Sequence, residues 1–330
     1  MPPKPKAASP VVDEPTRVMV LEKPQPAPQP EMPESVQEEP EKTPAPTVQA
    51  AANGRCVLIS GGDRGIGAAA ARAFYAAGYR VAVLYHSNAK AAAELEKQLP
   101  GITAVQCDVA SRASCELAFR TAEQALGRVD VLVSNAGIAQ QKLFTDITPE
   151  EWQHMLDVNL TGAFHLCQLA LPGMRARHSG MIINVSSIGA VRGALGNGYY
   201  SAAKGALELA SEALAKETAH LGIRVMLVEP GAFRTAFYDS ELKESEMRIL
   251  DYDALAQYYR KQTVRHDQLG DPAKGGAIIV DTALRQDAPL RLILGSDALQ
   301  AGQMTLQERL DELRTWQEIS KKSDHEDHIQ

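Results

Sequence analysis

The sequence predicts an α/β domain built on a doubly wound parallel sheet of about seven strands, with helices on both faces. From Arg55 onward, short apolar runs alternate with stretches of helical character. The runs are almost continuously apolar, as expected for strands that are covered on both faces. Strict alternation of strand and helix favours right-handed crossovers within one sheet. We therefore expect one such domain over residues 53–298.

Two helix starts in this pattern are marked by capping signals. Thr148, Pro149 and Glu151 form a capping box with proline at the first helical position. Asp271 and Pro272 repeat the cap and the proline. The expected strands are 56–60, 81–85, 103–106, 129–134, 181–187, 224–228 and 290–294, and the expected helices are 65–77, 89–99, 112–126, 149–175, 199–220 and 272–284.

Residues 1–52 differ in composition from the rest of the chain. Thirteen of the 19 prolines fall within residues 1–46, and this stretch has no aromatic residue. Such a segment cannot bury enough apolar surface to offset the entropy lost on ordering. We expect a disordered, proline-rich arm over 1–52, and a C-terminal helical extension over 299–330. The arm is interpreted as a solvated spacer, with a tether that docks residues 18–21 on a partner as the alternative.

Composition excludes several classes of protein. The net charge is -7, from 34 Lys+Arg against 41 Asp+Glu, and no basic block stands out, so a nucleic-acid binder is not expected. No apolar run approaches the roughly 18 residues of a membrane helix, and no signal pattern opens the chain. A cytoplasmic protein is expected. The four cysteines form no CxxC pair, which favours buried free thiols over a metal site or disulfides.

A glycine-rich turn follows the first expected strand. Residues 61–67 read Gly-Gly-Asp-Arg-Gly-Ile-Gly and lead into an alanine-rich helix. Glycines let the backbone approach a pyrophosphate, and the helix offers its N-terminal amides to the anion. Because the motif lies between a strand and a helix, it indicates a Rossmann-type dinucleotide site.

Four further motifs occur in order along the chain. Residues 134–137 read Ser-Asn-Ala-Gly, and Asn159 lies in a Val-Asn-Leu step. Ser187 precedes Tyr200 by 13 residues, and Lys204 follows Tyr200 by four. With the glycine turn, these motifs resemble the short-chain dehydrogenase/reductase family over nearly all of residues 55–297. Two departures are mild, since Ser60 replaces the family's usual threonine and Ser134 its usual asparagine.

The residues themselves suggest acid–base chemistry. Tyr200 and Lys204 share a helix face, whereas Tyr199 is rotated away. A phenol has a pKa of about 10, which an adjacent ammonium and the oxidised nicotinamide lower toward neutral pH. Tyr200 is then expected to protonate the alkoxide that forms as hydride arrives. Ser187 is expected to hold the same oxygen. The resemblance further implies that Asn159 kinks its helix and positions a water, and that Lys204 reaches the ribose hydroxyls.

The residues after the second strand bear on the choice of cofactor. A carboxylate there would accept a hydrogen bond from the 2'-hydroxyl of the adenosine ribose and would indicate a preference for NAD. This chain reads His86, Ser87 and Asn88 instead, and the resemblance places Arg64 against a 2'-phosphate. NADP is therefore expected, and NAD less so. Asp108 resembles the family's adenine contact, with a helix cap as the alternative. The expected cofactor-binding residues are Ser60, Gly61, Arg64, Gly65, Ile66, Gly67, His86, Ser87, Asn88, Asp108, Val109, Asn135, Ala136, Gly137, Tyr200, Lys204, Pro230, Gly231 and Thr235.

The sequence constrains the identity of the substrate less than that of the cofactor. The first half resembles 3-oxoacyl-carrier-protein reductases, and the later half, through residues 229–235 and 290–299, resembles 17-beta-hydroxysteroid-dehydrogenase-like members of the family. Both imply hydride transfer between NADPH and a carbonyl or secondary alcohol. Residues 236–265 carry aromatic side chains and are long enough for a lid.

Two questions remain open at this level. The resemblance implies a homodimer or homotetramer, and an apolar stripe in the extension is expected to pack on the core or across a subunit interface. The alternative to an enzyme is a dinucleotide-binding sensor or scaffold protein on the same fold. The stripe consists of Leu306, Leu310, Leu313, Trp316 and Ile319.

Overall fold

A computed structural model describes residues 54–235, 237, 243–244, 250–252 and 267–325 of the chain. The predicted arm over 1–52 and most of the predicted lid lie outside the described residues. Among those described, no helix combines the length and apolar character needed to cross a membrane.

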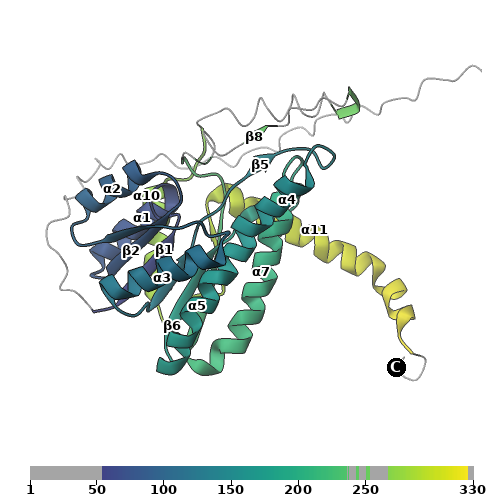
Figure 1. Cartoon of the computed structure of the whole chain (residues 1–330). Helices are drawn as coiled ribbons and strands as arrows, with labels where there is room; N and C mark the ends of the chain where they lie inside the picture. Colours follow the sequence, from purple (N-terminus) through teal and green to yellow (C-terminus); the bar gives the residue numbers. More distant parts are fainter. Residues whose placement is uncertain (1–53, 236, 238–242, 245–249, 253–266, 326–330) are drawn as a thin grey trace, which may run out of the picture. The chain divides into compact units, whose positions relative to one another are not determined.

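The central sheet has seven strands in the order β3-β2-β1-β4-β6-β7-β9, and every neighbouring pair is parallel (Figure 1). The order reverses between β1 and β4, which is the switch point of a doubly wound sheet. The predicted Rossmann-type fold is thereby confirmed. The strands are β1 Cys56–Ser60, β2 Arg80–Tyr85, β3 Thr103–Gln106, β4 Val131–Ser134, β6 Gly180–Val185, β7 Ile223–Pro230 and β9 Arg291–Leu294.

Helices cover both faces of this sheet and create two apolar cores. In β1, Val57 and Ile59 belong to one core, whereas Cys56 and Leu58 belong to the other. This alternation explains why the strand is apolar at consecutive positions. Helices α1 Gly65–Ala76, α2 Ala89–Gln98 and α10 Pro272–Leu284 contribute to the first core, and α3 Arg112–Leu126, α5 Gly162–Arg177 and α7 Gly198–Thr218 to the second.

The capping signals read from the sequence form as expected. The Thr148 side chain accepts from the amide of Glu151, and the Glu151 side chain accepts from that of Thr148, at the start of α4 Pro149–Leu156. The Asp271 side chain accepts from the amides of Ala273 and Lys274 at the start of α10.

The single helix predicted over 149–175 is wrong in one respect. Between α4 and α5 the residues Asp157–Thr161 form a π-helical segment. A π turn holds one residue more than an α turn, and such turns occur mostly as interruptions of longer helices. The interruption contains Asn159, whose side chain bonds to the backbone of Ile138 outside the helix.

The residues that flank the predicted lid on either side are described. The backbone of Gly270 bonds to Ala232 and Arg234, so the chain leaves the sheet edge and returns at one place. Within the excursion, β8 Lys243–Glu244 pairs in parallel with β5 Gln140–Gln141.

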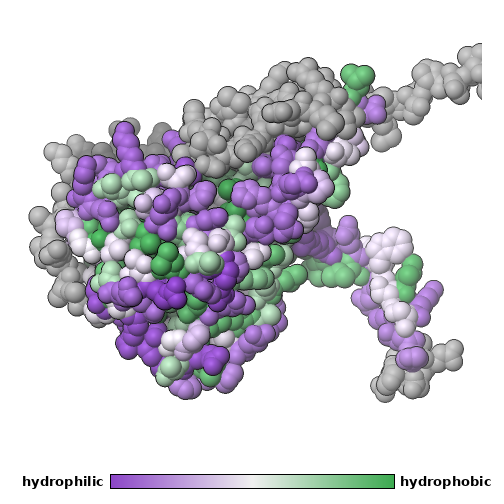
Figure 2. Space-filling model, viewed as in Figure 1, coloured by the Kyte–Doolittle hydropathy of each residue, from purple (hydrophilic) through white to green (hydrophobic). Residues whose placement is uncertain are grey.

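The C-terminal helix α11 Ser296–Ser320 carries the predicted apolar stripe. Its five side chains are 41 to 70% exposed, so they do not pack on the core of this chain. Figure 2 shows hydrophobic and hydrophilic residues side by side along this helix. The other expectation, packing across a subunit interface, stays a prediction.

Candidate active site

One cavity of about 480 Å³ opens at the carboxyl ends of the central strands. Ligands bind at this edge in open parallel sheets. All the predicted catalytic residues line it, and so do the predicted cofactor residues except Ser60 and Gly67. Those two lie behind its wall and support it.

The turn between β1 and α1 has the shape that its glycines allow. Gly61 and Gly65 adopt φ values of +60° and +56°, which other residues rarely take. A side chain at Gly67 would come within 2.2 Å of the carbonyl oxygen of Gly61. The first amides of α1 therefore face the cavity across bare backbone. This cradle fits the pyrophosphate of a dinucleotide.

Ser60 joins this turn to the end of β4. Its Oγ accepts hydrogen bonds from the amides of Asn135 (3.0 Å) and Ala136 (3.1 Å). The Asn135 side chain donates in return to the carbonyls of Ser60 (3.1 Å) and Gly61 (2.9 Å). The serine that replaces the family's threonine thus makes the bonds expected of its hydroxyl.

The segment after β2 lines the cavity without a carboxylate. Asn88 also caps α2, where its Oδ1 accepts from the amide of Ala91 at 3.1 Å. Its amide group is left with two donors. His86 and Ser87 lie beside it on the cavity wall, as does Arg64 from the glycine turn.

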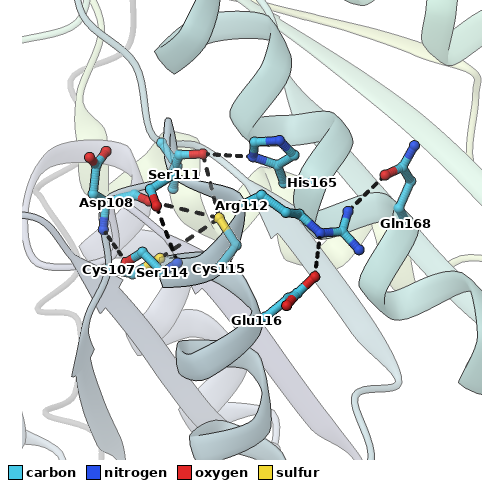
Figure 3. Close-up of polar contacts among 10 residues, drawn as sticks. Cys107, Asp108, Ser111, Arg112, Ser114, Cys115, Glu116, His165 and Gln168 are labelled. Atoms are coloured by element: carbon cyan, nitrogen blue, oxygen red, sulfur yellow. Dashed lines mark hydrogen bonds and ion pairs between the residues drawn. The ribbon is translucent and has the colours of Figure 1, made fainter.

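The segment after β3, whose polar contacts are drawn in Figure 3, forms the next part of the wall. Ser111 caps α3 by accepting from the amide of Ser114, so the cap alternative for Asp108 is wrong. The Asp108 carboxylate accepts from the amide of Ala110 at 3.0 Å, and the Asp108 amide donates to Ser114 Oγ at 3.0 Å. These bonds fix Asp108 at the cavity.

Asn159 lies in the π-helical segment and is 1% exposed. Its Oδ1 accepts from the amide of Ile138 (3.1 Å), and its Nδ2 donates to the carbonyl of Ile138 (2.9 Å). A side chain at Gly137 would come within 2.7 Å of the same Oδ1. Asn159 therefore holds the chain that follows β4 at a fixed distance from α5.

Ser187 and Tyr200 meet at Gly189. Ser187 Oγ accepts from the amide of Gly189 at 3.0 Å. A side chain at Gly189 would lie 3.3 Å from Ser187 Oγ and 3.3 Å from Tyr200 Cε1. Ser187 comes from the end of β6 and Tyr200 from the first turn of α7, so the absence of a side chain at Gly189 lets the two elements approach.

Lys204 lies one turn after Tyr200 on α7 and is buried. Its Nζ donates to the carbonyl of Val185 at 2.9 Å and lies 6.0 Å from the centre of the Tyr200 ring. Burial lowers the pKa of Lys204 to about 8, and the negative charge of Glu208 opposes this shift. The ammonium form therefore still predominates at neutral pH.

Tyr199 lies outside the cavity, as its rotation on the helix predicted. Its hydroxyl donates to the carbonyl of Phe144 at 2.9 Å, and its ring stacks on that of Phe144 with centroids 4.7 Å apart. The ring of Trp152 also lies against that of Tyr199, with centroids 5.0 Å apart.

One residue of the cavity wall comes from far along the sequence. The Asp297 carboxylate, in the first turn of α11, accepts from the amide of Ala232 at 2.8 Å. A side chain at Gly231 would come within 2.5 Å of the same carboxylate. Asp297 therefore fixes the segment after β7, where Pro230, Gly231 and Thr235 line the cavity. The acid follows a predicted strand, which is the signal that could have identified it.

Part of the cavity wall was not predicted in detail. Arg192 is exposed there and lines the wall with His154 and Asn197. Of the predicted lid aromatics, Phe237 lies 6.4 Å from Tyr200 between ring centroids. Tyr252 is described but does not line the cavity, and Tyr238, Tyr258 and Tyr259 lie outside the described residues.

All four cysteines are free and buried, as predicted. The described part of the chain has no group of three or more His, Cys, Asp or Glu side chains suited to a metal ion.

Comparison with known proteins identifies the family to which this chain belongs. The short chain dehydrogenase model matches residues 55–246. An acetoacetyl-CoA reductase of Shinella zoogloeoides is 41% identical over 181 residues, which cover 55% of this chain and 75% of that protein. A 3-oxoacyl-[acyl-carrier-protein] reductase of Synechocystis sp. is 36% identical over 212 residues, covering 63% and 84%.

A solved structure extends the likeness to the whole fold. A short-chain dehydrogenase from Streptomyces avermitilis has a TM-score of 0.76 and 34% identity, and the match covers 84% of this chain and all of that one. This chain therefore belongs to the short chain dehydrogenase family and is an oxidoreductase of that family.

Proposed function

We propose that the protein is an NADP-dependent reductase of ketone or 3-oxoacyl substrates, with Tyr200 as general acid and base. The observation that carries this proposal is the meeting of Ser187, Tyr200 and buried Lys204 in the same cavity as the glycine turn. A nicotinamide dinucleotide, when bound, supplies or accepts the hydride. The protein residues orient the substrate and move the proton.

Tyr200 transfers the proton in this proposal. An unperturbed phenol has a pKa of about 10 and transfers protons poorly at neutral pH. The Lys204 ammonium, held in place by the carbonyl of Val185, favours the phenolate form of Tyr200. In reduction Tyr200 donates its proton to the new alkoxide, and in oxidation it removes the proton.

Ser187 holds the substrate oxygen. Its Oγ already accepts from the amide of Gly189, which leaves the hydroxyl hydrogen to donate. A carbonyl oxygen between Ser187 and Tyr200 then receives two hydrogen bonds. These strengthen as negative charge develops on that oxygen in the transition state. Asn159 keeps Ile138 and Gly137 in place beside this site.

The choice of NADP rests on charge near the glycine turn. No carboxylate follows β2 on the cavity wall, where an acid would favour the ribose 2'-hydroxyl of NAD. Arg64, His86, Ser87 and Asn88 provide donors instead. A guanidinium binds a phosphate with paired, charge-assisted hydrogen bonds.

A 3-oxoacyl thioester is the first substrate to test. The names of two relatives specify acetoacetyl-CoA and 3-oxoacyl-[acyl-carrier-protein]. Arg192 on the cavity wall suits the phosphates of such a thioester carrier, since it is exposed and no ion pair or hydrogen bond of its guanidinium is seen among the described residues.

The test is a substrate panel. Acetoacetyl-CoA, a 3-oxoacyl pantetheine thioester and a neutral cyclic ketone are incubated with NADPH or NADH, and absorbance at the nicotinamide band is followed. We expect the thioesters to be reduced with NADPH. Intact NADPH binding without turnover of any carbonyl would instead support a dinucleotide sensor.

A further inference from the structure

A buried acidic cluster lies behind the active site, outside the cavity. Arg291 on β9 donates from Nε to Glu208 Oε2 at 3.0 Å, and the same Nε lies 3.7 Å from Glu229 Oε1. Glu208 is 6% exposed and Glu229 1%. One guanidinium therefore faces two buried carboxylates, although burying charge is costly unless it is paired.

Both carboxylates retain an oxygen without a hydrogen bond. Glu208 Oε1 and Glu229 Oε1 are buried and accept from no donor. Burial and, to a smaller extent, the charge of Glu208 together raise the pKa of Glu229 to about 7, against the opposing effect of Arg291. Glu208 is thus the member of the pair that Arg291 binds directly.

Glu208 is on the same helix as the catalytic pair. Tyr200, Lys204 and Glu208 are spaced by four residues along α7, so they follow one another along one face. Lys204 lies between the phenol and the carboxylate. Burial lowers the pKa of Lys204, and the charge of Glu208 is the contribution that raises it.

We propose that Glu208, held by Arg291, is a positioning residue for the reaction, because its buried carboxylate lies one helical turn after Lys204 on the same face of α7 and so acts on the ammonium beside Tyr200. This inference rests on the proposed function. Glu208 touches neither the cavity nor the reacting atoms. It acts through Lys204. Arg291 on β9 binds Glu208, and Glu208 lies one turn from Lys204, which in turn lies one turn from Tyr200 on α7.

Other charged groups lie on the elements packed around Lys204. On α7 these are Glu212 and Lys216, which pair at 2.7 Å, and Glu212 also accepts from Arg291 at 2.7 Å. The α4 helix and the π-helical segment, which also pack on α7, bring His154 and Asp157. Strand β6 brings no charged side chain, only the Val185 carbonyl that accepts from Lys204, whereas strand β7, which also packs on α7, brings Glu229.

The direction of the effect follows from charge. Removing the carboxylate of Glu208 leaves the buried ammonium without the charge that opposes its desolvation, so the proton on Lys204 is held less tightly. Reduction requires that both Tyr200 and Lys204 are protonated. Because Lys204 then loses its proton at a lower pH, this active form also disappears at a lower pH. The high-pH limb of the reduction profile should move to lower pH.

The experiment measures the Lys204 titration directly. Protein labelled with ¹³C at lysine Cε is titrated by NMR without cofactor or substrate, and the Lys204 signal is assigned with Lys204→Met. In Glu208→Gln we expect the Lys204 midpoint to fall by about 1 pH unit. Glu208→Asp should keep it near the parent value, and Glu212→Gln, one turn further and partly exposed, should leave it almost unchanged.

The second measurement is the pH profile of kcat/KM for acetoacetyl-CoA with NADPH. We expect its high-pH limb to shift down in Glu208→Gln and to recover in Glu208→Asp. An unchanged Lys204 midpoint, or a shifted midpoint with an unshifted limb, would overturn the proposal. Should Glu208→Gln not fold, Glu208→Met removes the charge with an apolar side chain of similar length and is read in the same way.

These outcomes are separable from the proposed function. If Tyr200→Phe keeps full turnover while the Lys204 midpoint still depends on Glu208, the proposed function fails and the electrostatic link stands. If Tyr200→Phe is inactive and the Lys204 titration midpoint is the same with and without the Glu208 carboxylate, only the present inference fails.

Discussion

The hydroxyl of Ser60 accepts hydrogen bonds from two consecutive backbone amides, those of Asn135 at 3.0 Å and Ala136 at 3.1 Å. Ser60 ends β1 and the two amides follow β4, so one side chain joins the strands on either side of the switch point. The glycine turn and the wall opposite it are therefore held in one arrangement.

Ser60→Ala should destabilise the fold and weaken dinucleotide binding. Two amides at this buried position lose their acceptor, which costs about 1 to 3 kcal/mol. Thermal unfolding and NADPH fluorescence titration measure the two effects. Ser60→Thr keeps the hydroxyl and is the matched control. A melting temperature for Ser60→Ala equal to the parent's would contradict the structural role.

Tyr200→Phe should abolish most turnover while NADPH still binds. The change removes the proton donor and preserves the ring, so kcat should fall by roughly 10²-fold or more. Steady-state reduction of acetoacetyl-CoA is the assay. Tyr199→Phe controls for loss of a neighbouring phenol, and it should have little effect because Tyr199 bonds to the carbonyl of Phe144 outside the cavity. Near-parental turnover in Tyr200→Phe would end the assignment.

Arg64→Ala should weaken NADPH more than NADH. Only NADPH carries the 2'-phosphate, and losing a charge-assisted contact costs roughly tenfold or more in affinity. Kd values for the two cofactors give the ratio. Arg72 lies on α1, the helix that follows Arg64, bonds to Gln98 and does not line the cavity, so Arg72→Ala is the control. Equal losses for both cofactors in Arg64→Ala would mean that Arg64 has no part in selectivity.

Arg192→Ala should raise KM for acetoacetyl-CoA by roughly twofold to fivefold and leave kcat almost unchanged. An exposed guanidinium contributes modestly to binding an anion, and salt screens the contribution. A neutral ketone carries no charge for it to bind and should show no change. The KM ratio between the two substrates, at low and at high salt, is the measurement, and a parallel change for both would rule out an anion contact.

Glu229→Gln should stabilise the protein at pH 8 and much less near pH 4.5. The folded pKa of Glu229, raised to about 7 from an ordinary value near 4.5, means that the folded chain retains a proton which the unfolded chain loses earlier. The carboxyl group therefore lowers stability progressively as pH rises from about 4.5 to 7, by on the order of 3 kcal/mol. Glutamine imitates the protonated form and avoids that loss.

The measurement for Glu229→Gln is the difference in melting temperature from the parent across this pH range. Glu212→Gln should behave in the opposite sense, because Lys216 and Arg291 lower the pKa of Glu212 to about 2 and its charged form is the stabilising one. A difference for Glu229→Gln that does not change with pH would place its effect in packing instead of ionisation.

The sequence predicted features that depend on local patterns. The strand over 56–60 has the observed bounds because it is apolar on both faces, and the capping box at Thr148 depends only on residues three positions apart. The sequence also placed Ser187, Tyr200 and Lys204 in one site, and in the structure all three line one cavity.

Features that depend on distant contacts were not predicted. The family resemblance implied a kink at Asn159, but nothing within the helix sequence shows that the interruption is π-helical or that Asn159 bonds to Ile138. Asp297 supports Ala232 across 65 positions of sequence. Glu208 has a local signal, an acid four residues after Lys204 on the same helix, but only the contact with Arg291 shows that it is buried.

The π-helical segment Asp157–Thr161 also determines which changes in chain length the protein can tolerate. Such a turn holds one residue more than an α-helix needs, and a single deletion within it would let the helix close into a regular ladder. The α-helical residues on either side would keep their faces, because the π turn is what accommodates the additional residue. Asn159 would turn away from Ile138, while the composition of the helix barely changed. A deletion of one residue in this segment should therefore leave the helix packed and remove the bonds between Asn159 and Ile138, so that activity is lost before stability.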